Sequence, residues 1–174
     1  YDFGSRDVAA ALTFEIRNEG DRPRHIELYT HLVLALRSCQ SYHRIPAAGV
    51  RFSRVRSAIV GEFNAPRLSR AALFVQNVGA LPHSWSTNGK GLAVRDSGWS
   101  NWIERGGPLS VEGGSAGTPI AAFTYRATLE PGDSLRVVQI IGSTKGKEVP
   151  GSMNRAARGW QKEVVEYAAR IESA

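Results

Sequence analysis

Three tryptophans lie close together in a glycine-rich stretch of the sequence, between Leu81 and Gly117. Sugar rings present apolar C–H faces that stack on exposed indoles, while amide, carboxylate and guanidinium groups bond the sugar hydroxyls. Because the stretch supplies both kinds of group, we predict a carbohydrate contact at Trp85, Trp99, Trp102, Asp96, Asn101 and Arg105. Tryptophan is also a common packing residue beneath long loops, and this second interpretation stays open.

Two histidines and a carboxylate alternate along the segment after Arg24, at His25, Glu27 and His31. Imidazole and carboxylate groups are ligands for zinc and other divalent metals. His25 and His31 are separated by roughly 20 Å if the segment is an extended strand. Two side chains at that distance cannot reach one ion, so we predict no metal site here and no cofactor.

Other motifs for nucleophilic or phosphate chemistry are incomplete. Cys39 and His43 could form a thiolate–imidazolium pair, but the sequence identifies no orienting group, and a lone cysteine is usually a small core residue. The run from Gly142 to Lys147 has one residue too few between its glycines for a P-loop. Glu148 also follows the lysine, where a P-loop has serine or threonine. We therefore predict no catalytic residue in these segments.

The composition is that of a single folded domain. The chain has 174 residues, of which 42% are hydrophobic and 22% charged, close to globular averages. The formal charge of +6 comes mainly from arginines spread along the chain, so we predict no nucleic-acid partner. No apolar run approaches the ~20 residues that span a bilayer, and the single Cys39 cannot close an internal disulfide. We expect a cytoplasmic protein without membrane contact.

Alternation of apolar and polar residues with a period of two indicates half-buried strands. We predict the first two strands to be antiparallel neighbours around a turn at 18–23, and the last two to flank a tight connection at 130–133. The predicted strands are Val8–Arg17, Arg24–Leu36, Val50–Val60, Ala71–Val78, Pro119–Leu129 and Ser134–Ile141. Their predicted inward residues include Ile26, Leu28, Leu32, Phe123, Tyr125, Leu129, Leu135, Val137 and Ile141.

The C-terminal segment changes to a helical pattern from Ser152 onward, with Trp160, Val164, Tyr167 and Ile171 recurring at three- and four-residue spacing. We therefore expect a β-sandwich domain over residues 1–150 and a helix over 151–174. The helix would lie across the sandwich or lead into a following domain. Because the chain begins at Tyr1 without a signal-peptide pattern, we expect it to be a fragment of a longer protein.

The segment from Ala11 to Ala35 resembles the N-terminal β-sandwich of the cellobiose and chitobiose phosphorylases and cyclic β-1,2-glucan synthases. As in that family, a strand ends in Asn18, a short turn carries Arg22-Pro23-Arg24, and the next strand contains Tyr29. The segment Leu129–Ser134, followed by an apolar strand, resembles the closing hairpin of the same domain. The final helix is similar to the linker into the family's (α/α)₆ catalytic barrel.

This resemblance implies an all-β fold, namely an antiparallel β-sandwich with a C-terminal linker helix. The large galactose-mutarotase-like supersandwich is one form that this sandwich could take. It implies a non-catalytic accessory domain that packs on such a barrel and shapes its entrance. The expected partners are a glucan or oligosaccharide, the downstream catalytic domain and a second copy in a homodimer.

Two other functions remain open. A free-standing carbohydrate-binding module would use the loop tryptophans as platforms. An epimerase or lyase would use a base such as His83 together with a carboxylate in a concave sheet.

Overall fold

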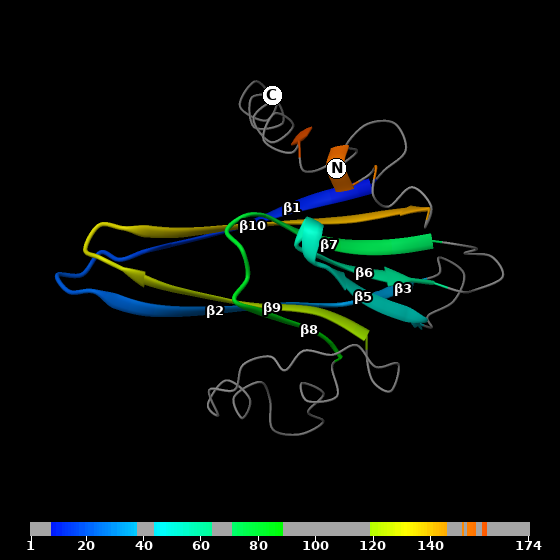
Figure 1. The fold of residues 1–174 in the computed structure, drawn as a ribbon, viewed down its shortest axis with the longest axis horizontal. Coiled ribbons are helices and arrows are strands. Elements are labelled where there is room, and N and C mark those ends of the chain that lie inside the picture. Colours follow the sequence, from blue (N-terminus) through cyan, green and yellow to red (C-terminus); the bar gives the residue numbers. More distant parts are fainter. Residues whose placement is uncertain are drawn as a thin grey trace.

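The computed structural model shows two antiparallel β-sheets packed face to face, which confirms the predicted all-β sandwich (Figure 1). It describes residues 8–37, 44–63, 71–88, 119–145, 151, 153–155 and 158–159. The larger sheet has five strands, in the spatial order β1 (Val8–Arg17), β10 (Ser134–Lys145), β7 (Ala71–Gly79), β6 (Ala58–Glu62) and β5 (Gly49–Ser53). The smaller sheet has three strands, in the order β2 (Arg24–Val33), β9 (Pro119–Leu129) and β8 (Ser84–Asn88).

A short two-stranded ribbon continues from the smaller sheet. It pairs β3 (Ala35–Arg37) with β4 (Arg44–Pro46). The predicted strand Arg24–Leu36 is therefore interrupted at Leu34, whose side chain is fully buried and whose backbone bonds Pro119 and Ala47.

The predicted pairing of consecutive strands is wrong at both ends of the chain. β1 pairs with β10 and β2 pairs with β9, so the turns 18–23 and 130–133 are arches that connect one sheet to the other. Asn18 holds the two arches together. Its buried side chain donates to the carbonyls of Arg22 (2.7 Å) and Leu129 (2.9 Å), and its backbone bonds Gly132 and Asp133. Because the arches lie side by side, the apolar faces of the strands turn toward one another instead of lying in one plane.

The predicted single strand Val50–Val60 is instead a hairpin of β5 and β6, joined by the 3₁₀ turn η1 (Arg54–Arg56). Ser57 ends this turn in the left-handed conformation, with φ of 48°. The turn contains no glycine or proline, which are the usual sequence signals of a reversal of direction.

The main core fills the space between the sheets. Predicted inward residues face this space in both sheets, among them Phe123 and Tyr125 of β9 and Val137 of β10. Trp85 of β8 also lies in this layer and stacks on Phe52 of β5, with ring centroids 4.2 Å apart. The prediction of which strand face turns inward is therefore confirmed, although several strand partners are not the predicted ones.

A buried hydrogen-bond network crosses the same core. Gln139 of β10 donates from Nε2 to Thr30 Oγ1 of β2 (2.7 Å), Tyr125 Oη (3.0 Å) and Asn77 Oδ1 of β7 (3.2 Å). Tyr125 donates its hydroxyl to the same Asn77 oxygen, and burial raises the pKa of this phenol. Asn77 Nδ2 in turn donates to the carbonyl of Ser57 (2.9 Å). The network therefore joins two strands of each sheet.

A second apolar cluster covers the outer face of the larger sheet. Phe74, Val60 and Ile140 are buried there together with Met153. Met153 belongs to a helical stretch described at residues 151, 153–155 and 158–159, so the beginning of the predicted helix packs on the sandwich. The remainder of the predicted helix, including Trp160, lies outside the described residues. Within the described part of the chain, no helix is long and apolar enough to cross a membrane.

Gly142 marks the closest packing in this outer cluster. A Cβ atom at this position would lie less than 3.0 Å from two ring carbons of the buried Phe74. We predict that Gly142→Ala lowers the free energy of unfolding by about 1–3 kcal/mol, the usual cost of overpacking a core. Urea denaturation measures this change.

The matched control is Gly49→Ala in β5, where an added Cβ meets no atom within 4 Å. That substitution should leave stability unchanged or slightly higher. A Gly142→Ala protein as stable as wild type would contradict the described packing, whereas partial recovery on adding Phe74→Leu would support it.

Candidate functional site

Polar side chains gather on the outer face of the three-stranded sheet, opposite the core. Side chains alternate along a strand, so the outward positions of β2 are His25, Glu27, Tyr29 and His31, as the sequence pattern predicted. Their register partners on β9 are Thr128, Arg126, Thr124 and Ala122. Below, the term polar face refers to Glu27, Tyr29, His83, Ser84, Thr124 and Arg126.

Glu27 is the centre of the polar face. Its carboxylate accepts the hydroxyl of Tyr29 through Oε2 and forms a salt bridge with the Arg126 guanidinium through Oε1. The Tyr29 hydrogen bond and the charge of Arg126 lower the pKa of Glu27 below its ordinary value of 4.5. The same carboxylate raises the pKa of Tyr29. Glu27 is therefore ionised at neutral pH and Tyr29 is a neutral donor.

His83 extends the array from the connection before β8. Its backbone N–H donates to the carbonyl of Thr124 (2.7 Å), which fixes its position beside β9. Its Nε2 lies 3.0 Å from Arg126 Nη1. A guanidinium can only donate, so Nε2 is the acceptor in this contact and does not carry the imidazole proton. The lone pair that a catalytic base would use is therefore already engaged.

Two hydroxyls beside the array lack hydrogen-bond partners in the described part of the chain. Thr124 is fully buried, and its Oγ1 has no partner; the same holds for the buried Oγ of Ser84. Ser84 and Thr124 pair directly across β8 and β9, and Thr124 pairs with Tyr29 across β9 and β2. Buried hydroxyls are normally satisfied, so these two are exceptions, and neither oxygen is open to solvent.

Of the six residues predicted to contact carbohydrate, only Trp85 lies in the described part of the chain. Trp85 points into the core, where Phe52 covers one face of its indole ring. Trp99, Trp102, Asp96, Asn101 and Arg105 lie outside the described residues, as do Cys39 and His43. The contact predicted at these positions stays a prediction.

His25 and His31 keep to one continuous strand, as the spacing argument assumed. His25 bonds Thr128 through Nδ1 (2.9 Å), whereas His31 lies toward the opposite end of β2. Among the described residues, no group of three or more potential ligands is arranged to hold a metal ion.

Arg126 and Thr124 were not among the predicted site residues. The signal that pointed to them was present in the sequence, since Thr124, Arg126 and Thr128 alternate with the inward Phe123 and Tyr125. Without knowledge that β9 pairs with β2, the sequence gives no reason to place Arg126 beside Glu27. Strand pairing, and not residue type, was the missing information.

The ionisation of Glu27 provides a test of the array. Its folded-state pKa lies below the ordinary value, so its contacts stabilise the fold above the unfolded-state pKa and are lost as pH falls through the folded-state pKa. We predict that Tyr29→Phe moves the pKa of Glu27 upward, because the largest cause of the shift is removed. Carbon-detected NMR titration of the Glu27 carboxyl measures it.

His25→Gln is the matched control for this titration, because His25 lies on the same strand face but bonds Thr128 instead of Glu27. It should leave the Glu27 titration in place. An unchanged Glu27 pKa in Tyr29→Phe would show that the hydroxyl contact does not form.

Comparison with known proteins adds no family assignment. No model of a protein family matches the chain, and no curated protein matches it significantly.

Proposed function

We propose that this sandwich is a glycan-contacting accessory domain of a carbohydrate-active enzyme whose reaction centre lies outside it. The observation that carries the proposal is the fixed array of Glu27, Tyr29, Arg126 and His83 on the outer face of the three-stranded sheet. The resemblance of the chain to the sandwich of glycoside phosphorylases is consistent with this role.

The chemistry of the polar face suits sugar hydroxyls. Each sugar hydroxyl donates one hydrogen bond and accepts others, so its partners must include donors and acceptors at fixed positions. Arg126 has five N–H donors, and its described contacts use Nε and Nη1, which leaves donors for a ligand. The Glu27 carboxylate is an acceptor, and it is exposed on the same face.

The array is also positioned before a ligand arrives. Glu27 and Arg126 are cross-strand partners on neighbouring strands, and each is held by a second contact, to Tyr29 and to His83. A binding group that is already oriented loses less conformational entropy on binding. The same contacts weigh against an epimerase or lyase with His83 as base, because Arg126 occupies its Nε2.

Arg126→Ala tests the proposal. Gluco-oligosaccharides of different linkages would be titrated into the protein and followed by amide chemical shifts. We predict that wild type binds at least one of them, with shifts on β2, β8 and β9, and that Arg126→Ala weakens this binding about tenfold or more. Loss of charge-assisted hydrogen bonds worth about 1.5–3 kcal/mol accounts for that factor.

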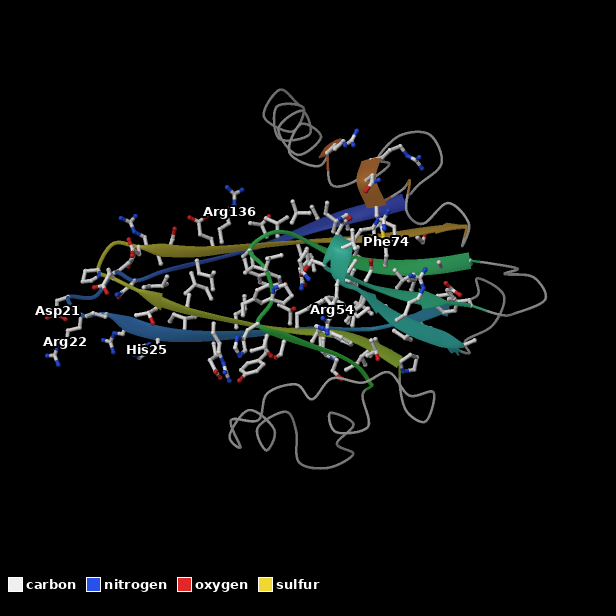
Figure 2. The ribbon with its side chains drawn as sticks, viewed as in Figure 1. Asp21, Arg22, His25, Arg54, Phe74 and Arg136 are labelled. Carbon is white, nitrogen blue, oxygen red and sulfur yellow. The ribbon has the colours of Figure 1, made fainter. Side chains whose placement is uncertain are left out.

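Arg136→Ala is the matched control. Arg136 is an exposed arginine on β10, on the opposite outer side of the sandwich from His25 (Figure 2). It should leave binding unchanged. Equal losses in both arginine variants would show that only net charge matters, and no shift with any glucan would contradict the proposal.

Trp99→Ala and Trp102→Ala distinguish the tryptophan platform from the polar face. If these variants abolish binding while Arg126→Ala keeps it, the domain is a binding module that uses its loop tryptophans. If Arg126→Ala alone abolishes binding, the polar face is the site.

A further inference from the structure

A cavity of about 230 Å³ lies between the two sheets, at the side where β1 and β2 form their edges. Its walls are apolar and come from both sheets: Leu12, Phe14, Leu32, Val75, Ala121 and Ile141. Leu12 is 43% exposed although it faces inward, so the cavity reaches the surface beside it. Tyr29 and His31 are also among the lining residues, and Thr30 and Gln139 of the buried network supply its polar part.

The orientation of the Gln139 amide follows from the network. The carbonyl of Ser57 can only accept, so the Asn77 amide must direct Nδ2 toward it and Oδ1 toward Tyr125 and Gln139. Gln139 must then present its Nε2 donor to Asn77 Oδ1. The hydrogen bonds of Gln139 within the described residues all use Nε2, and its Oε1 is left able to accept one more.

The Gln139 side chain is 4% exposed, so little of it is open to bulk water. A donor placed in the cavity would bond this amide oxygen, and one net hydrogen bond is worth about 1 kcal/mol. The described residues that line the cavity include no carboxylate, lysine or arginine. Burial lowers the pKa of His31, so its imidazole is mainly neutral at pH 7. The cavity is therefore suited to an uncharged molecule.

The volume limits the size of that molecule. An apolar protein cavity of about 150 Å³ holds benzene, so this cavity accommodates a ring with a short substituent, roughly ten non-hydrogen atoms. We infer that the space between β1 and β2 is a binding site for a neutral amphipathic molecule, whose apolar body fills the cavity and whose hydroxyl donates to Gln139 Oε1. This site shares Tyr29 with the polar face, but it does not depend on the proposed function.

Two probes that differ by one hydroxyl test the inference: 4-propylphenol and propylbenzene. Each would be titrated into the whole chain and followed by methyl and amide chemical shifts. We expect 4-propylphenol to bind with shifts at Leu12, Leu32 and Ile141 and at the Gln139 side-chain amide. Propylbenzene should bind about five- to tenfold more weakly, the factor that corresponds to one net hydrogen bond.

Leu12→Trp should weaken both probes at least tenfold, because the larger side chain fills the cavity. Leu12 is partly exposed on an edge strand, so the fold has room to accept the change. Thr13→Trp is its control, since Thr13 lies on the same strand with its side chain on the outer face. It should bind like wild type.

Gln139→Met tests the hydrogen bond. Once a thermal melt shows that it is folded, it should bind 4-propylphenol no more tightly than propylbenzene, because the phenol hydroxyl has lost its acceptor. Failure of both probes to bind wild type, or unchanged binding by Leu12→Trp, would overturn the site. Equal affinity of wild type for the two probes would overturn the assigned role of Gln139.

Discussion

The side chain of Asn77 is the polar link on which the arrangement of the two sheets depends. It is buried, it is anchored to the Ser57 carbonyl of its own sheet, and it accepts hydrogen bonds from Tyr125 of the other sheet and from Gln139. Gln139 then reaches Thr30 in the other sheet. Apolar packing alone tolerates small shifts of one sheet over another, but these bonds form only in one registration. An unpaired member would carry a desolvation cost of about 1–3 kcal/mol, which penalises every other registration.

The two candidate sites lie on opposite sides of the same strand, β2. Its outward residues Glu27 and Tyr29 belong to the polar face, whereas its inward residues Thr30 and Leu32 line the cavity. A single registration of β2 against β9 places Glu27 beside Arg126 and also presents Thr30 to Gln139. A slip of one residue would turn each set to the wrong side. The network therefore supports the geometry of both sites.

Local pattern in the sequence predicted much of the fold and little of the site. The bounds of β1 and β9 and the inward faces of the outer strands follow from alternation, which depends only on neighbouring residues. The arches at Asn18 and the hairpin at Ser57 depend on contacts between distant segments, and alternation carries no information about them. For the same reason Glu27 and Tyr29 were recognised as outward residues, whereas Arg126, about a hundred residues away, was not recognised as their partner.

A double-mutant cycle on Thr30 and Gln139 tests the dependence on the network most directly. Urea unfolding of wild type, Thr30→Val, Gln139→Met and the double variant gives the coupling free energy between the two side chains. The described geometry predicts a favourable coupling of about 1 kcal/mol or more, because either single variant removes the direct hydrogen bond between Gln139 Nε2 and Thr30 Oγ1 in the core. Additive effects, within about 0.5 kcal/mol, would contradict it and would show that apolar packing alone sets the registration of the sheets.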